Sequence, residues 1–158
     1  MNRKESNILP SVLDRLLDYE PGVSRESAQV RFTTIKQVKD RVTRDLERLL
    51  NTKGTIQAPP RSYSELRSSL FTYGLTDFTS HSPRSQSIRE TIRQEIERAI
   101  SCFEPRLRNV AVRLETLDQA ERNLRFKITG LLVIDPLVEP VTFDTYFDIN
   151  RGEYIIQK

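Results

Sequence analysis

The hydrophobic residues of this chain recur with helical spacing before Pro105 and alternate with polar residues after it. The clearest helical pattern follows Ser87, where isoleucines stand every fourth residue at positions 88, 92, 96 and 100. Ser87 and Glu90 have the spacing of a capping box, which predicts that the helix begins there. Pro105 has no backbone N–H and disfavours helical geometry at Glu104, so we expect the helix to end near Phe103.

Three earlier segments also have helical patterns. Residues 8–17 predict a short helix that is too short to be stable alone, so it must pack on this domain's own core or on a neighbouring protein. Residues 34–50 predict a longer helix that begins with Thr34 and Gln37. Residues 64–73 predict a short helix, with Gly74 as the left-handed residue that ends it. The residues Leu9, Leu13 and Leu16 fall on one face of the first short helix. In the second short helix we expect Leu66, Leu70 and Tyr73 to face inward.

After Pro105 the alternation predicts four strands, at residues 110–115, 124–134, 141–149 and 153–157. Short connections join consecutive strands, and the last of these is a tight turn with Gly152 at the position that requires positive φ. We therefore predict an α+β fold in which about four helices pack on one face of a four-stranded, mainly antiparallel sheet. The last strand is expected at an edge of the sheet.

Composition indicates a single domain over residues 1–158, in which residues 1–31 form an N-terminal docking helix and a linker. The 25 basic and 22 acidic residues are interspersed, which does not favour nucleic-acid binding. The single cysteine, Cys102, suits a reducing compartment. The sequence has no signal-peptide pattern and no apolar run of the ~18 residues that a membrane span requires. We therefore expect a cytosolic protein.

The sequence offers little catalytic chemistry. One histidine and one cysteine cannot form a conventional triad, and no Gly-rich phosphate loop is present. We therefore expect no cofactor, no metal at His81 and no enzymatic activity. Glycoside hydrolysis stays open as the enzymatic alternative, because it needs only two carboxylates and Glu104 lies beside Phe103. Against it, Arg106 favours the charged form of Glu104, and the chain has no tryptophan for sugar stacking.

Five segments carry a resemblance to a known family, and one of them contains the triplet Glu104-Pro105-Arg106. The segments are residues 9–16, 44–52, 73–78, 103–107 and 143–148. On these segments the chain resembles the small baseplate-wedge family of contractile injection machines, sometimes labelled "lysozyme-like", and most closely its TssE-like branch from type VI secretion systems. The Glu-Pro-Arg triplet is the signature of that family.

The resemblance implies a structural baseplate component without catalysis. TssE-like proteins dock on the wedge proteins TssF and TssG, with TssK also in the baseplate, and help to start the TssB/TssC sheath. The implied location is the bacterial cytoplasm, at the cytoplasmic face of the inner membrane and without insertion into it. A distant branch of the same fold consists of anti-adaptors that bind a response regulator, so a partner-binding module is the second non-enzymatic interpretation.

The candidate partner-binding residues lie in three places. The first is the corner Glu104, Pro105 and Arg106, which either docks a partner or forms an internal salt bridge between helix and sheet. The second is the short N-terminal helix with Leu9, Leu13 and Leu16. The third is the last strand, where we expect Tyr154, Ile155 and Ile156 to form a bare edge that accepts a strand from the sheath.

Overall fold

A computed structural model describes residues 12, 16, 22, 34–55, 59–60, 62–78, 85–115, 124–135, 137–148 and 151–157. The chain consists of two compact units, Met1–Val42 and Thr43–Lys158. In the part of the chain that is described, no helix is long and apolar enough to cross a membrane.

Helix α2 (Ile35–Asn51) begins in the first unit, where Thr34 and Gln37 form a capping box at its start. The backbone N–H of Thr34 donates to Gln37 Oε1 at 2.9 Å, and the backbone N–H of Gln37 donates to Thr34 Oγ1 at 3.3 Å. Val12 and Leu16 are helical, with 73% and 76% of their surfaces exposed. Leu9 and Leu13 lie outside the described residues.

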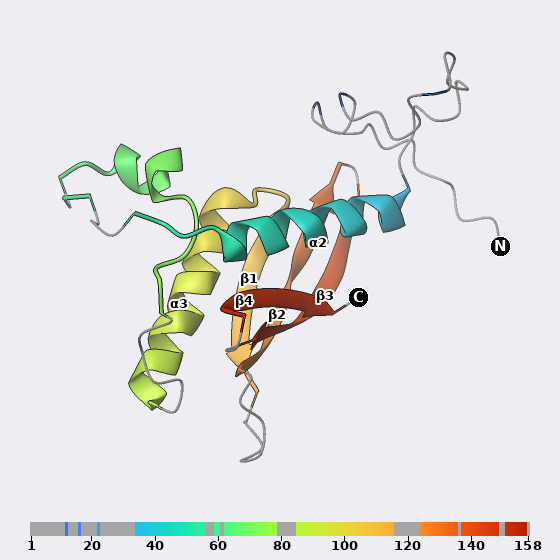
Figure 1. Ribbon diagram of the computed structural model, residues 1–158. Coiled ribbons are helices and arrows are strands. Elements are labelled where there is room, and N and C mark those ends of the chain that lie inside the picture. Colours follow the sequence, from blue (N-terminus) through green and yellow to red (C-terminus); the bar gives the residue numbers. More distant parts are fainter. Residues whose placement is uncertain are drawn as a thin grey trace. The chain divides into compact units, whose positions relative to one another are not determined.

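The second unit contains a four-stranded antiparallel sheet with the strand order β1-β2-β3-β4, shown in Figure 1. Each strand pairs with the next along the chain, which confirms this part of the prediction. The strands are β1 (Leu107–Leu114), β2 (Leu124–Ile134), β3 (Leu137–Asp148) and β4 (Glu153–Gln157). Gly152, in the turn before β4, has φ 67° as predicted.

Two strands begin earlier than the alternation predicts. Leu107 and Arg108 already pair with β2, but the register shifts before Ala111, where Asn109 has φ 53°. This bulge interrupts the alternation and hides the start of β1 from a pattern analysis. Strand β3 begins at Leu137 and includes Pro140, although proline usually argues against a strand.

The predicted number of helices is wrong. The described residues contain two α-helices, α2 and α3 (Gln86–Phe103), rather than about four. The segment 64–73 instead forms two 3₁₀-helices, η2 (Glu65–Ser68) and η3 (Leu70–Thr72). The hydroxyl of Ser69 donates to the Leu66 carbonyl at 2.9 Å, and that of Thr72 donates to the Arg67 carbonyl at 2.8 Å. Such local side-chain bonds compete with the α-helical pattern.

Helix α3 ends at Phe103 as predicted, but its start differs. The helix begins at Gln86 with Ser85 at the N-cap, so Ser87 lies inside the first turn and forms no capping box with Glu90. The Ser87 hydroxyl instead lies 2.8 Å from the Ser85 hydroxyl.

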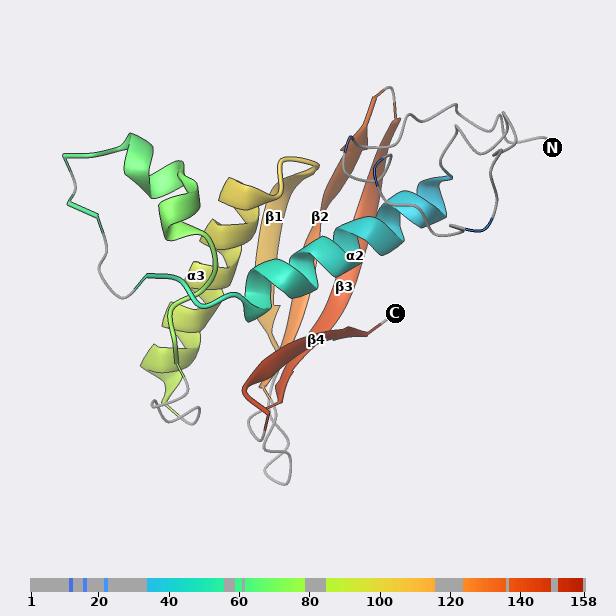
Figure 2. The same ribbon diagram turned by 45° about the horizontal axis from the view of Figure 1, so that its top comes forward.

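The core of the second unit lies between the helices and one face of the sheet. In Figures 1 and 2 the second half of α2 crosses this face, while α3 runs beside β1. Alternate residues of β2 are buried, and the residues between them face the open side. The buried hydrophobic residues of this unit include Leu46, Leu49, Leu50, Ile92, Ile96, Ile100, Val112, Phe126, Ile128, Leu132, Phe143, Tyr154 and Ile156.

A close backbone contact fixes the segment that follows the two 3₁₀-helices. Lys53 and Leu75 form a parallel bridge, in which Gly54 N donates to Leu75 O at 2.8 Å and Leu75 N donates to Thr52 O at 2.9 Å. Gly74 has φ 102°, and a Cβ at this position would lie 2.3 Å from the Thr52 carbonyl oxygen. Only glycine fits here.

Replacing this glycine should therefore destabilise the protein. We expect Gly74→Ala to lower the free energy of unfolding by at least about 2 kcal/mol, because it adds backbone strain and a steric clash. Urea denaturation measures this loss. Gly54→Ala is the matched control, since its Cβ would meet its nearest neighbour at an ordinary 3.5 Å. Equal stability of the two variants would contradict the conclusion that only glycine fits at position 74.

Candidate functional site

The corner between α3 and β1 is built by three consecutive residues. Glu104 is the C-cap of α3, and its N–H donates to the Ile100 carbonyl at 2.9 Å. Pro105 is exposed and turns the chain away from the helix axis. The Arg106 carbonyl accepts from Val133 N at 2.8 Å, so the sheet begins as soon as the helix has ended.

The side chains of this corner form a partly buried ion cluster with α2. Arg106 Nε donates to Glu104 Oε1 at 2.6 Å, and Arg106 Nη2 donates to Glu104 Oε2. The same Nη2 donates to Asp45 Oδ2 at 2.7 Å. Only 5% of the Glu104 side chain is exposed. The cluster therefore joins α2, the end of α3 and the start of β1.

The charges in this cluster shift the pKa values of their neighbours. Hydrogen bonds from Arg106 to Glu104, and then to Asp45, raise the pKa of the Arg106 guanidinium although burial opposes this. Burial raises the pKa of the Tyr73 phenol, and the negative charges of Asp45 and Glu104 raise it further. The Tyr73 ring meets the Phe103 ring edge-on, with the ring centroids 5.1 Å apart.

This geometry matches the internal salt bridge that the sequence left open as an alternative. The Glu104 carboxylate is buried and accepts hydrogen bonds from Arg106 on both of its oxygens. Pro105 is exposed, and 29% of the Arg106 side chain is exposed. A docking role for this corner stays a prediction.

The last strand is not the bare edge that the sequence predicts. Tyr154 and Ile156 are buried, with their side chains in the core. The Tyr154 N–H donates to Asn51 Oδ1 and the Tyr154 carbonyl accepts from Asn51 Nδ2, both at 2.8 Å. The Ile156 N–H donates to Glu47 Oε1 at 3.3 Å. The backbone of Ile155 faces the other way, toward β3, where Ile155 pairs with Tyr146.

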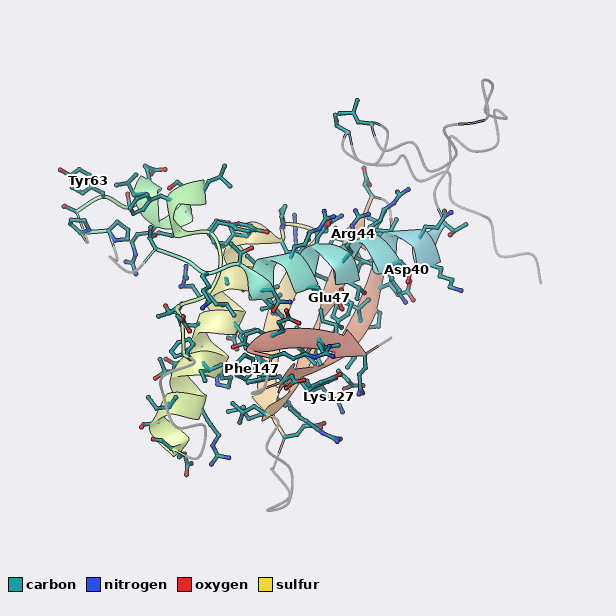
Figure 3. All side chains as sticks on the ribbon, viewed as in Figure 1. Asp40, Arg44, Glu47, Tyr63, Lys127 and Phe147 are labelled. Atoms are coloured by element: carbon teal, nitrogen blue, oxygen red, sulfur yellow. The ribbon has the colours of Figure 1, made fainter. Side chains whose placement is uncertain are left out.

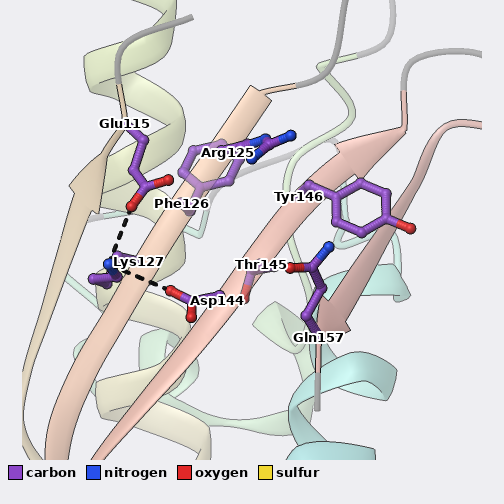
Figure 4. Close-up of a pocket in the computed structure, with 8 residues that line it drawn as sticks. All are labelled: Glu115, Arg125, Phe126, Lys127, Asp144, Thr145, Tyr146 and Gln157. Atoms are coloured by element: carbon purple, nitrogen blue, oxygen red, sulfur yellow. Dashed lines mark ion pairs between the residues drawn. The ribbon is translucent and has the colours of Figure 1, made fainter. Parts of the chain in front are cut away.

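The open face of the sheet carries a polar hollow of about 260 Å³. In Figure 4 Lys127 lies between two carboxylates, at 3.2 Å from Glu115 and 3.6 Å from Asp144. The hollow is further lined by Arg125, Phe126, Thr145, Tyr146 and Gln157. The pairing of Lys127 with both carboxylates accounts for its raised pKa, chiefly through the hydrogen bond to Glu115. Among the described residues, no group of three or more His, Cys, Asp or Glu side chains is placed to hold a metal ion.

An apolar patch lies on the segment with the two 3₁₀-helices. The prediction that Leu66 and Leu70 face inward is wrong, because 40% and 84% of their surfaces are exposed. Phe71 is 51% exposed, and Figure 3 shows Tyr63 at the outer end of the same segment. We call Tyr63, Leu66, Leu70 and Phe71 the apolar patch. A cluster of exposed large apolar side chains is typical of an interaction surface.

Sequence analysis missed the residues that complete these sites. Asp45, Glu47 and Asn51 read as ordinary polar positions on the solvated side of α2, yet they bind Arg106, Ile156 and Tyr154. Their spacing is the one available signal, because Glu47 and Asn51 stand four residues apart and so share a helix face.

The comparison with protein-family models agrees with the resemblance found in the sequence. A family model described as "Baseplate wedge protein gp25" matches residues 36–137. A solved structure described as "The baseplate complex from the type VI secretion system" aligns with 18% sequence identity and a TM-score of 0.48. The alignment covers 70% of this chain and 94% of that chain. No match is found among the curated proteins.

The ion cluster predicts a large stability effect at Arg106. Arg106→Ala leaves the buried Glu104 carboxylate without its partner, which typically costs about 3–5 kcal/mol. We expect thermal and urea unfolding to show a loss of this order. Arg108→Ala, at an exposed position two residues further along the chain in β1, is the control and should change stability by less than about 0.5 kcal/mol. An unchanged melting temperature in Arg106→Ala would show that the cluster does not join the helices to the sheet.

Proposed function

Because the chain belongs to the baseplate wedge protein gp25 family, we propose that it is a structural component of a contractile baseplate, specifically that of a type VI secretion system. The observation that carries the proposal is the family match over residues 36–137, which includes the Glu104-Pro105-Arg106 corner. The choice of a type VI system follows from the resemblance of the sequence motifs to TssE-like proteins. The proposed location is the bacterial cytoplasm, at the inner membrane.

In this proposal the ion cluster supports docking surfaces rather than forming one. Arg106 holds α2 and α3 to the first strand through Asp45 and Glu104. A rigid frame fixes the positions of the exposed residues around it and lowers the entropic cost of binding. The burial of Glu104 also argues against the glycosidase alternative, which depended on this carboxylate.

We assign the contact with the wedge proteins TssF and TssG, next to TssK, to the apolar patch. Four large apolar side chains exposed on one short segment are costly in water and gain free energy when a partner covers them. The Thr55 hydroxyl donates to the Phe71 carbonyl at 2.6 Å, which connects the patch to the segment that follows α2. Apolar side chains are enriched in the cores of permanent interfaces, so the patch suits a permanent neighbour in an assembly.

We further propose that the C-terminal strands start the TssB/TssC sheath by accepting a strand, but alongside β3 rather than β4. Strand β4 pairs only with residues 144–148 of β3. In the register of β2 and β3, the backbone C=O groups of Val138, Pro140 and Thr142, and the N–H groups of Val138 and Thr142, point away from β2. They point to the edge of β3 with which β4 pairs further along. No described residue pairs with this half of β3 from that side. Pro140 fits here because its missing N–H would face outward.

The docking assignment predicts that charge in the apolar patch prevents wedge binding. We expect the double variant Leu70→Asp, Phe71→Asp to lose at least about 30-fold in affinity for purified TssF–TssG, as for removal of an interface hot spot. The melting temperature should change little, because at least half of the surface of each residue is exposed. Ser62→Asp adds a charge next to the patch and is the control. Binding is measured by calorimetry or by co-elution.

The two parts of this proposal fail in different ways. A wild-type chain that binds no wedge protein, and whose loss leaves secretion from its own bacterium unchanged, would refute the baseplate function. Wild-type binding with an unaffected double variant would refute only the assignment to the apolar patch.

The sheath proposal predicts a specific effect at Thr142. Thr142→Pro removes an N–H that points away from β2, so we expect a folded protein that still binds the wedge but no longer supports sheath assembly. Thr142→Val keeps the N–H and should support normal sheaths. Fluorescent TssB in cells reports assembly. Normal sheaths with a folded Thr142→Pro variant would rule out strand addition along β3.

A further inference from the structure

Both outer edges of the sheet are bonded by side chains from a helix. On β4, Asn51 binds the N–H and the carbonyl of Tyr154, and Glu47 binds the N–H of Ile156. Figure 3 shows Glu47 between α2 and β4. These backbone groups are the ones that an added strand would use, because Glu153, Ile155 and Gln157 face β3.

The opposite edge repeats the arrangement with a different helix. On β1, the N–H of Val112 donates to Glu97 Oε2 at 3.3 Å, and the carbonyl of Val112 accepts from Arg93 Nη1 at 3.5 Å. Arg93 and Glu97 are also paired with each other at 2.7 Å. In both cases the two side chains stand four residues apart on the helix and reach the outward-facing groups of the edge strand.

We propose that Glu47 and Asn51 form an edge latch, which keeps β4 closed to added strands and keeps the free protein from pairing edge to edge with a second copy of itself. An unpaired edge strand is a template for association, and natural proteins cover it in several ways. Strand β4 needs such cover, because its sequence Glu-Tyr-Ile-Ile-Gln is rich in β-forming residues and carries a single charge.

The second copy is the partner that the geometry favours once the latch is open. Two β4 strands can meet antiparallel around a twofold axis, where each offers the same two groups of Tyr154 and the N–H of Ile156 to the other. Such a pairing would extend the sheet across the dimer. The inference concerns the isolated chain and holds whether or not the protein belongs to a type VI baseplate.

Hydrogen exchange of the wild-type protein tests the latch without any substitution. We expect the amides of Tyr154 and Ile156 to be protected, although they lie on the outer side of an edge strand. Exchange at the rate of an unstructured peptide at both amides would overturn the proposal.

Single substitutions then test each bond separately. Asn51→Ala should speed exchange at Tyr154 by about tenfold and leave Ile156 protected. Glu47→Ala should do the reverse, whereas Glu47→Gln keeps an acceptor oxygen and should retain protection at Ile156. Thr52→Ala, which loses only a bond to the Arg48 carbonyl, is the control.

The double variant Asn51→Ala, Glu47→Ala tests the consequence. We expect it to form a concentration-dependent dimer in size-exclusion chromatography with light scattering, under conditions where the wild type and Thr52→Ala are monomeric. If this double variant is too unstable, Asn51→Ala alone frees both groups of Tyr154 and should dimerise weakly. A folded double variant that stays monomeric with unchanged exchange would refute the edge latch.

Discussion

The rest of the second unit depends on the interactions of Arg106. The guanidinium of this residue binds Glu104 and Asp45, and its backbone carbonyl accepts a hydrogen bond from Val133 N, so one residue connects both helices and the sheet. Removing three charged groups from water is costly, and an ion cluster of this kind is often no more stabilising than apolar side chains of the same size. The bidentate geometry instead fixes how the Arg106 guanidinium lies against the Glu104 carboxylate at the joint between α3 and β1. Pro105 restricts the same joint from the backbone side.

Local patterns predicted the elements whose signals are contained in a few residues. The alternation in β2, the end of α3 before Pro105 and the turn at Gly152 all depend on near neighbours. Long-range contacts were not accessible in this way: Asp45 meets Arg106 across 61 positions, and Asn51 meets Tyr154 across 103. The helical period also failed where local hydroxyl bonds favoured 3₁₀ geometry, and the alternation failed where a bulge interrupts β1.

The helices of this unit therefore have two roles at the sheet. Their apolar faces cover one side of it, while polar side chains at the rim of those faces bind the backbone of the edge strands. An edge strand whose backbone groups are bonded by side chains differs from one protected by charge or proline. Each hydrogen bond to a side chain can be replaced by a hydrogen bond of similar strength to the backbone of an added strand. The sheet thus combines exchangeable protection on β1 and β4 with a proline on the free half of β3.

The most recognisable sequence motif of the chain, Glu104-Pro105-Arg106, is therefore not where its most exposed apolar side chains lie. Glu104 is almost completely buried, whereas Leu70 on an irregular segment is almost completely exposed. A buried ion cluster requires particular residues at particular spacings, since any change leaves a charge unpaired. An exposed apolar patch requires only side chains of suitable size, which leaves no motif in the sequence. Sequence reasoning therefore finds the frame of such an assembly protein readily, and only the structure distinguishes that frame from the surfaces that it positions.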